Sequence, residues 1–259
     1  MKQYDPDYFR LVVMKVPMSN GWEPDYIPPR DKNEFKLDES LIRARGKIFE
    51  YAMVNGFDHF ITLTLNKEKI DRHDLDEYSR KLGQFIRNYR RDYGVSIEYL
   101  LIPERHKNGA WHIHGLIKGI PFEHLEQYTL QDTIPEKMRS MIRDGRKLFK
   151  WPAYQDRFGY CSLEAVKDKK SVAKYITKYI TKSIEITQSD ASRKNKKLYY
   201  HSRGLLGAKK LKEGTFLAGS VPSEWISFEN EYCMGFELTR SQYEAISGNL
   251  RSEIIIPHE

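Results

Sequence analysis

VSIEYLLIPERHKNGAWHIHGLIK, residues 95–118, is the stretch that organises the fold. Its two apolar halves flank Asn108-Gly109, the strongest short-range signal for a β-hairpin. We therefore expect antiparallel strands over residues 95–104 and 110–118. Because side chains alternate along a strand, this pairing also decides which polar residues share a face of the sheet.

Helical and extended patterns alternate before this hairpin. Apolar residues recur with helical spacing from Asp38 to Asn55-Gly56, where a helix end is expected. A strand follows over residues 59–66, in which Phe60, Thr62 and Thr64 face one way. A second helix is predicted over residues 71–93, with Asp71 and Asp74 as candidate N-caps and Gly94 as its stop.

The same alternation continues after the hairpin. We expect a helix near residues 134–149, opened by a Thr133/Glu136 capping box, then a strand over 158–166 and a helix over 169–183. This order predicts an α+β fold in which a central sheet containing antiparallel strands has its helices packed on one side. That arrangement is of the ferredoxin or RNA-recognition-motif type.

Three parts are predicted along the chain. Residues 1–56 supply an N-terminal strand, a surface excursion and a helix, and residues 57–183 form the core. Residues 184–259 are expected to form a basic addition packed on that core.

Composition limits the class of protein. The chain has 259 residues, 43 Lys and Arg against 36 Asp and Glu, and 40% hydrophobic residues, so it can bury a core and is neither disordered nor fibrous. Two cysteines cannot form a disulfide framework, no window suits a membrane span, and the N-terminus lacks the apolar stretch of a signal peptide. We expect a cytoplasmic protein, and its net charge of +7 suits a polyanionic partner.

The second strand of the hairpin carries a histidine pair. His112 and His114 are two residues apart, so both imidazoles project from one face of the sheet. For the histidine pair alone, two polar side chains satisfied by ordinary hydrogen bonds are the simpler interpretation. A carboxylate beside them favours a metal site instead, because two histidines and one carboxylate leave positions open for a substrate oxygen.

Glu104, on the partner strand, supplies that carboxylate only in one type of hairpin. A plain two-residue turn at Asn108-Gly109 sets Glu104 opposite Ile113, on the wrong face. One additional loop residue sets Glu104 opposite His112 or His114, and Asn-Gly also suits a three-residue loop with Gly in the left-handed conformation. A site of Glu104, His112 and His114 therefore predicts an irregular hairpin.

The segment SVAKYITKYITKS places Tyr175 and Tyr179 on one helix face, at the border between an apolar and a lysine stripe. Two core tyrosines on an amphipathic helix are the simpler interpretation. A tyrosine nucleophile for a phosphodiester would need such a place, because nearby cations favour the phenolate. Lys178 and Lys182 each follow a tyrosine by three residues.

Together these segments resemble a known family. FITLTLN, PERHKNGAWHIHGLI and VAKYITKYITK, in this order, resemble the three motifs of HUH endonucleases, the rolling-circle replication initiators (Rep) of phages and plasmids. The greatest likeness is to replication-associated proteins similar to the filamentous-phage gene II product. The paired tyrosines also resemble the two-tyrosine motif of isometric-phage initiators, and YYHSRGL, residues 199–205, resembles a further basic motif.

The resemblance implies a role for each matched residue. His112, His114 and Glu104 would be the metal ligands, usually for Mg²⁺ or Mn²⁺, Tyr175 and Tyr179 the nucleophiles, and Lys178 the lysine of the tyrosine motif. By its spacing after Tyr179, Lys182 is expected to assist in the same way. Trp111 stands where many relatives have proline. Basic and aromatic residues on the last helix and after it are expected to contact DNA: Lys174, Arg193, Lys194, Lys196, Lys197, Tyr199 and Arg203.

The activity implied is metal-assisted nicking of single-stranded DNA at an origin, with a 5′-phosphotyrosine link and a free 3′-OH, and strand rejoining at termination. Tyr175 is expected to attack first. No P-loop signature occurs, so unwinding would come from supercoiling or a host helicase, and a host DNA polymerase would extend the 3′-OH in a bacterial cell.

Other classes remain open on sequence grounds. A non-catalytic single-stranded nucleic-acid-binding protein would leave the histidine pair without a use. A cupin would be nearly all β, against the predicted helices. Transposases and relaxases share the HUH site, although a relaxase normally has its tyrosine before the histidines.

Overall fold

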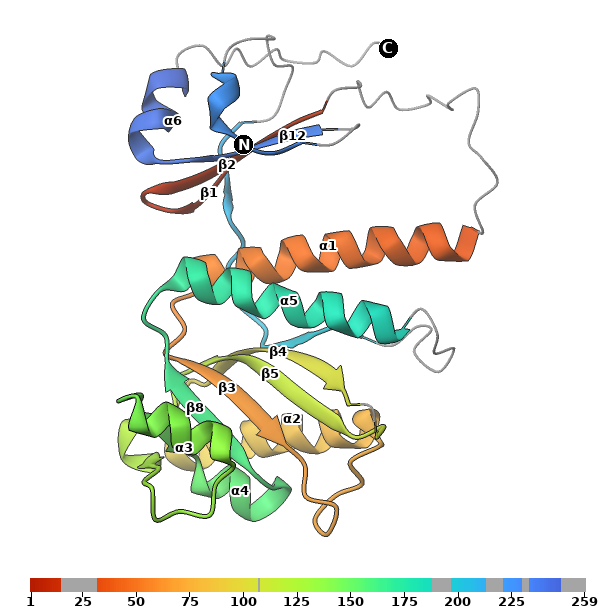
Figure 1. The fold of residues 1–259 in the computed structure, drawn as a ribbon, viewed down its shortest axis with the longest axis vertical. Coiled ribbons are helices and arrows are strands. Elements are labelled where there is room, and N and C mark those ends of the chain that lie inside the picture. The colour runs from red at the N-terminus through yellow and green to blue at the C-terminus, as the bar shows by residue number, and fades with distance from the viewer. Residues whose placement is uncertain (15–31, 107, 188–196, 213–220, 230–232, 248–259) are drawn as a thin grey trace. The chain divides into compact units, whose positions relative to one another are not determined.

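The computed structural model describes residues 1–14, 32–106, 108–187, 197–212, 221–229 and 233–247. Contacts divide the chain into two units, one of residues 36–205 and one of residues 1–35 with 206–259. Each unit is described by itself (Figure 1). No described helix combines the length and the apolar character that crossing a membrane requires.

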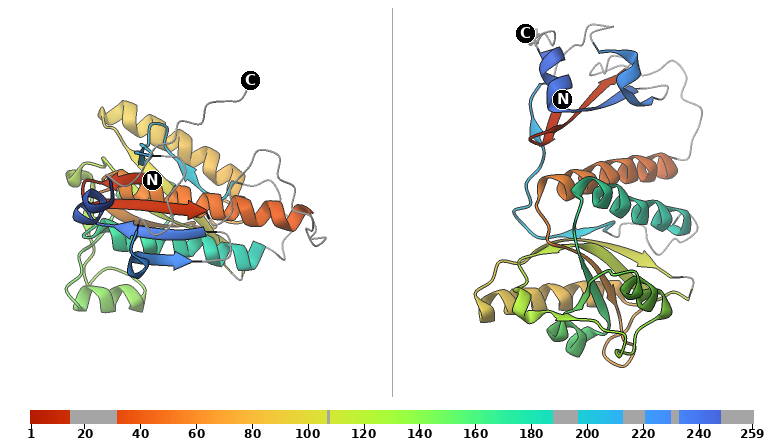
Figure 2. Two further views of the ribbon diagram at one scale, coloured as in Figure 1. Left: turned by 90° about the horizontal axis from the view of Figure 1, so that it is seen from above. Right: turned by 60° about the vertical axis from the view of Figure 1, so that its left-hand side comes forward.

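The larger unit is built on an antiparallel sheet of seven described strands. Their order across the sheet is β6-β7-β8-β3-β5-β4-β9. Its strands are β3 (His59–Thr64), β4 (Glu98–Arg105), β5 (Trp111–Lys118), β6 (Glu126–Gln127), β7 (Leu148–Lys150), β8 (Cys161–Ala165) and β9 (Tyr200–His201). Figure 1 shows β3, β4, β5 and β8 between helices, and the right-hand view of Figure 2 shows the same layers after a turn about the vertical axis.

Helices cover both faces of this sheet, which corrects the prediction of helices on one side. Figure 1 shows α1 (Lys32–Val54) and α5 (Lys169–Thr187) on one side and α2 (Leu75–Tyr93) on the other. The reason lies in β4, where Leu100, Leu101 and Ile102 are all at most 3% exposed. Consecutive buried residues point to opposite faces, so each face needs its own cover.

The core on the α2 side follows the predicted pattern. Asp74 caps α2 by accepting a hydrogen bond from the Glu77 backbone N–H, and Gly94 ends it in the left-handed conformation, as expected. The apolar face of α2 packs with Ile61 and Leu63 of β3 and with residues of α4 (Pro152–Phe158) in one cluster. Phe60, Thr62 and Thr64 therefore share the opposite face, as predicted, and this face is the α5 side.

The segment between the hairpin and β8 differs from the prediction. A short 3₁₀ turn, η1 (Phe122–His124), is followed by α3 (Glu136–Arg143), whose N-cap is Pro135 without any side-chain hydrogen bond. The Thr133/Glu136 capping box was therefore wrong. The helix also ends early, because Gly145 has a φ of +79° and the next residues pair with β8 as β7.

The hairpin has the irregular geometry that was predicted. β4 and β5 pair with Glu104 opposite His112 and Arg105 opposite Trp111. The His106 N–H then bonds to the Ala110 carbonyl, which leaves a three-residue loop, and Gly109 has a φ of +82°. This geometry places Glu104 on the histidine face of the sheet.

The smaller unit is a second antiparallel sheet, made from both ends of the chain. The order is β10-β1-β2-β12-β11, and residues 9–14 of β2 pair with residues 233–238 of β12. The C-terminal residues were expected to extend the core, so the division differs from the three predicted parts. The elements are β1 (Lys2–Asp5), β2 (Tyr8–Met14), β10 (Lys209–Lys210), η3 (Ser223–Trp225), β11 (Ile226–Glu229), β12 (Cys233–Leu238) and α6 (Arg240–Ser247).

Replacing Gly109 by alanine should destabilise the larger unit, because an L-residue with positive φ costs about 1–2 kcal/mol. Gly46 lies inside α1, where an added Cβ meets no atom within 4 Å, so Gly46→Ala should stabilise by about 0.5–1 kcal/mol. Urea denaturation of both variants measures the two changes. Equal effects of the same sign would contradict the assigned conformation of Gly109.

Candidate active site

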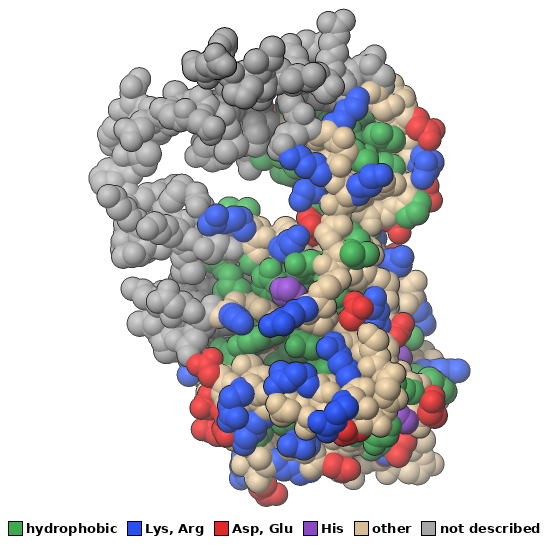
Figure 3. All heavy atoms as spheres, turned by 180° about the vertical axis from the view of Figure 1, so that it is seen from behind, with side chains coloured by type: hydrophobic (Ala, Val, Ile, Leu, Met, Phe, Trp, Pro, Cys, Tyr) green, Lys and Arg blue, Asp and Glu red, His purple; other side chains and the backbone are tan. Residues whose placement is uncertain are grey.

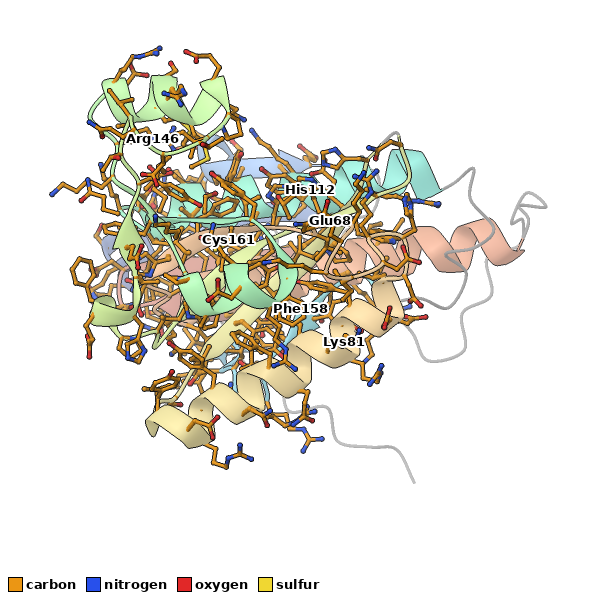
Figure 4. All side chains as sticks on the ribbon, turned by 90° about the horizontal axis from the view of Figure 1, so that it is seen from below. Glu68, Lys81, His112, Arg146, Phe158 and Cys161 are labelled. Carbon is orange, nitrogen blue, oxygen red and sulfur yellow. The ribbon has the colours of Figure 1, made fainter. Side chains whose placement is uncertain are left out.

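Three neighbouring strands place a polar cluster on the α5 side of the sheet. Thr62 and Thr64 of β3 lie opposite His114 and His112 of β5, respectively, and Glu104 of β4 lies opposite His112. In Figure 4, His112 lies close to α5, whereas Phe158 lies close to α2 and α4. The two faces of the sheet are thus chemically distinct, one apolar and one carrying the candidate site.

Glu104 meets the histidine pair directly. Its Oε2 lies 2.8 Å from His114 Nε2, and the two side chains are 16% and 12% exposed. This contact depends on the three-residue hairpin loop, because a two-residue loop would turn Glu104 to the α2 side. The structure therefore brings together Glu104 and His114, as the sequence predicted.

Threonine hydroxyls hold the other nitrogen of each imidazole. Thr62 Oγ1 lies 3.2 Å from His114 Nδ1, and Thr64 Oγ1 lies 3.4 Å from His112 Nδ1, a longer and weaker contact. A hydrogen bond at Nδ1 orients the ring and directs Nε2 to the opposite side. This arrangement is typical of histidines that bind a metal through Nε2.

His112 has a strongly perturbed environment. Burial, together with the neighbouring His106 and His114, lowers the pKa of His112 to about 4, against a smaller opposing effect of Glu104. The His106 ring stacks on the His112 ring, with centroids 3.9 Å apart. His112 is therefore neutral at physiological pH, and a neutral imidazole is the form that binds a metal ion.

Helix α5 brings both tyrosines to this cluster. Ala173 and Ile176, both fully buried, anchor the helix. The Tyr179 ring stacks on the His114 ring at 3.9 Å, and the hydroxyls of Tyr175 and Tyr179 lie 2.7 Å apart. The sequence prediction that the phenols and imidazoles occupy one region agrees with these contacts.

The two phenols differ in accessibility. Tyr175 is 45% exposed, whereas Tyr179 is half-buried between His114 and Phe60. Burial, the hydrogen bond with Tyr175 and the Glu104 carboxylate all raise the pKa of Tyr179 well above its ordinary value. Tyr179 is thus a poor nucleophile in this state, because its phenolate lies in a partly dry environment facing a negative charge.

The donor set suits a divalent cation. Two imidazoles and one carboxylate leave positions for water and a phosphate oxygen, and suit Mg²⁺, Mn²⁺ or zinc. In the described part of the chain, however, no three His, Cys, Asp or Glu side chains are already placed to hold a metal ion. The Glu104 Oε2 and His114 Nε2 atoms, which would both have to face an ion held by this set, are hydrogen-bonded to each other.

The predicted basic residues lie in several places. Lys174 and Lys178 are exposed on α5, and no hydrogen bond or ion pair of Lys178 with either phenol occurs among the described residues. The side chain of Lys182 lies outside the described residues, as do Arg193, Lys194 and Lys196 in their entirety. Lys197 and Tyr199 line a separate groove beside α1, and Arg203 is exposed just after β9.

Sequence reasoning missed the side chains that orient the site. The sequence pattern predicted only a shared face of a strand for Phe60, Thr62 and Thr64. In the structure, Thr62 and Thr64 contact the imidazoles and Phe60 packs against both tyrosines. Period-two alternation on β3 already put these three residues on one face. The sequence pattern did not show that β3 pairs with β5, and this pairing determines that Thr62 and Thr64 lie opposite His114 and His112.

Comparison with known proteins confirms the resemblance read from the sequence. A family model for replication-associated proteins of the ORF2 and filamentous-phage gene II type matches residues 58–184. The matched segment contains β3, the hairpin and the tyrosines of α5. No curated protein and no solved structure matches the chain.

Replacing Thr62 or Thr64 by valine should weaken Mn²⁺ binding by about 10- to 100-fold, because the imidazole loses the hydroxyl that orients it. Isothermal titration calorimetry with Mn²⁺ at fixed pH measures this. Thr129→Val, which also loses a hydroxyl hydrogen bond but lies outside the site, is the matched control. Unchanged affinity in both Thr62→Val and Thr64→Val would contradict the orienting role.

Proposed function

Residues 58–184 match the model of the family of replication-associated proteins of the ORF2 and filamentous-phage gene II type, and from that match we propose that the protein initiates rolling-circle replication. It would nick single-stranded DNA at an origin by tyrosine attack on one phosphodiester. The observation that carries this proposal is the stacking of Tyr179 on His114, with Tyr175 bonded to Tyr179. Two phenols beside a histidine pair and a carboxylate are the parts that such a reaction needs.

The strand order supports a ferredoxin-like HUH fold for the larger unit. β3, β4, β5 and β8 occur in the order β8-β3-β5-β4 across the sheet, with α2 between β3 and β4 along the chain. Numbered along the chain, this is the order 4-1-3-2 of a split β-α-β fold. The histidines then lie on a central strand, where the sheet positions them most rigidly.

The chemical step can be written from the residues present. His112, His114 and Glu104 would hold a divalent cation, Mg²⁺ or Mn²⁺, which when bound polarises the scissile phosphate. The tyrosine oxygen attacks phosphorus in line, the P–O3′ bond breaks, and the 3′ oxygen takes up a proton to become a 3′-OH. The phenol proton passes to solvent, and the protein keeps the 5′ end as a phosphotyrosine.

Tyr175 is the tyrosine that we propose attacks first. Tyr175 is the more exposed of the two residues, and its hydroxyl shares with Tyr179 the hydrogen bond that positions it. Tyr179 would act at termination, once bound DNA and a cation have changed its surroundings. At that point the first tyrosine still holds one DNA strand. Because the two hydroxyls lie within hydrogen-bonding distance of each other, the second tyrosine could cleave the new junction while the first strand is released and rejoined.

The lysines of α5 complete the proposal. Lys174, Lys178 and Lys182 lie on the same helix as the tyrosines, and cations there would stabilise the phenolate and the phosphate. The proposed partner is single-stranded origin DNA. A host polymerase would extend the 3′-OH, with a host helicase or supercoiling opening the duplex.

The test is formation of a covalent adduct with Mn²⁺ and a pool of randomised single-stranded oligonucleotides labelled at the 3′ end. Because the protein keeps the 5′ end of the downstream fragment, the 3′ label should stay with the protein on a denaturing gel. Wild type and Tyr179→Phe should form the adduct, Tyr175→Phe should lose most of it, and the double variant should form none.

Tyr93→Phe is the matched control, because Tyr93 is an exposed tyrosine of α2 and should leave the adduct unchanged. The released 5′ fragment should also be extended by a DNA polymerase, which shows its 3′-OH. An adduct that persists in the Tyr175→Phe, Tyr179→Phe double variant would eliminate both assigned nucleophiles.

A further inference from the structure

A concave site lies beside α1, and its lining includes none of Tyr175, Tyr179, His112 and His114. It is a groove of about 750 Å³ between one face of α1 and the strand that closes the sheet edge. Arg43 and Lys47 line it from the helix, and Lys197, Tyr199 and His201 line it from β9 and the residues before it. Figure 3 shows one face of the molecule, on which Lys and Arg side chains lie beside hydrophobic ones.

Aromatic rings form a continuous series in this region. Tyr51 and His201 have ring centroids 5.0 Å apart, and Tyr199 stacks on His201 at 5.7 Å. Tyr51 lies one helical turn after Lys47, so α1 contributes both a cation and a ring to the same side. His201 is exposed and Tyr199 is partly exposed, which leaves ring surface available to a ligand.

Positive charge surrounds these rings. The Lys47 ammonium lies 4.7 Å from the Tyr51 ring centre and 2.7 Å from the buried Glu50 carboxylate, which neutralises it. The guanidinium of Arg43 and the ammonium of Lys197, both on exposed side chains, add two further positive charges to the described lining. A groove with these cations and a series of rings complements an anionic chain that has flat groups attached.

The β9 side of the groove is held in place by the sheet. Tyr200 and His201 pair with Leu101 and Leu100 of β4. The buried Ser202 accepts a hydrogen bond from the Tyr99 N–H through its hydroxyl, and its own N–H donates to the Tyr99 carbonyl. The rings on β9 are therefore positioned before any ligand binds, which lowers the entropy cost of binding.

We propose that this groove binds a segment of single-stranded nucleic acid, with phosphates at Arg43 and Lys197 and bases stacked on Tyr199 and His201. Only unstacked bases present a face to an aromatic side chain, so the rings favour a single strand over a duplex. This inference rests on the proposed function in one respect, that the natural ligand is origin DNA. The groove would be a DNA-binding site additional to the site of cleavage, and α1 supplies part of its lining.

Fluorescence anisotropy with a 30-nucleotide oligo(dT) tests the groove without requiring any cleavage. In Arg43→Ala/Lys197→Ala the negative slope of log affinity against log salt concentration should become shallower by about 1.4. Each lost phosphate contact on a single strand contributes about 0.7 to the magnitude of that slope. The control Lys137→Ala/Lys147→Ala removes two exposed lysines elsewhere in the larger unit and should change the slope little. Equal losses in the two pairs would overturn the proposal in favour of diffuse attraction.

The aromatic part has its own test. Tyr199→Leu should weaken oligo(dT) binding by about tenfold, whereas Tyr199→Phe, which keeps the ring, should bind as wild type does. Thermal unfolding of both variants shows whether the fold is intact. A duplex of equal length should respond less to Tyr199→Leu, and an equal response would overturn the assignment to a single strand.

Failure of the nicking proposal would look different. Tyr175→Phe/Tyr179→Phe should bind oligo(dT) with unchanged affinity if the groove acts as proposed, whether or not wild type forms an adduct. Arg43→Ala/Lys197→Ala should bind oligo(dT) more weakly than wild type, whether or not wild type forms an adduct. Loss of oligo(dT) binding in the tyrosine double variant would place the main binding site at the phenols and overturn the groove.

Discussion

The candidate site depends on the three-residue loop that joins β4 to β5. Gly109, with a positive φ, closes this loop and sets the register in which Glu104 lies opposite His112. Since strand side chains alternate, a loop one residue shorter would turn Glu104 toward the apolar core on the α2 side. The polar face would then hold two imidazoles without a carboxylate. Backbone geometry at one glycine thus determines the chemistry of three strands.

Much of the candidate site was predictable because its parts are local. The histidine pair, the two tyrosines one helical turn apart and the loop at Asn108-Gly109 each follow from short sequence periods. The fold was less predictable where contacts are distant in sequence. Nothing local pairs β2 with β12, and the two residues of β9 and the seven of α4 are too short to show a period. Helices on both faces could have been inferred from the continuous apolar run in β4.

The site combines features that favour and oppose tyrosine chemistry. Stacking on His114 orders the Tyr179 ring, but the same burial and the Glu104 charge disfavour its phenolate. A divalent cation between Glu104 and the histidines would oppose that charge effect, because the nearest anion would become a ligand of a cation. Activation of the second phenol and occupation of the proposed metal site are then linked by electrostatics.

The smaller unit has a consequence for how the chain matures on the ribosome. β2 has β1 as a local partner on one edge, but Met14 on its other edge pairs with Cys233, so that edge has no partner until more than two hundred further residues have been made. At elongation rates of about 5 to 20 residues per second this is a wait of roughly 10 to 40 s. Residues 36–205 lie between the two pairing segments and include no described strand of that sheet, so they can fold while translation continues. During this interval the β1–β2 hairpin presents the free edge of β2, and an unpaired strand edge is open to capture by a chaperone or by another polypeptide.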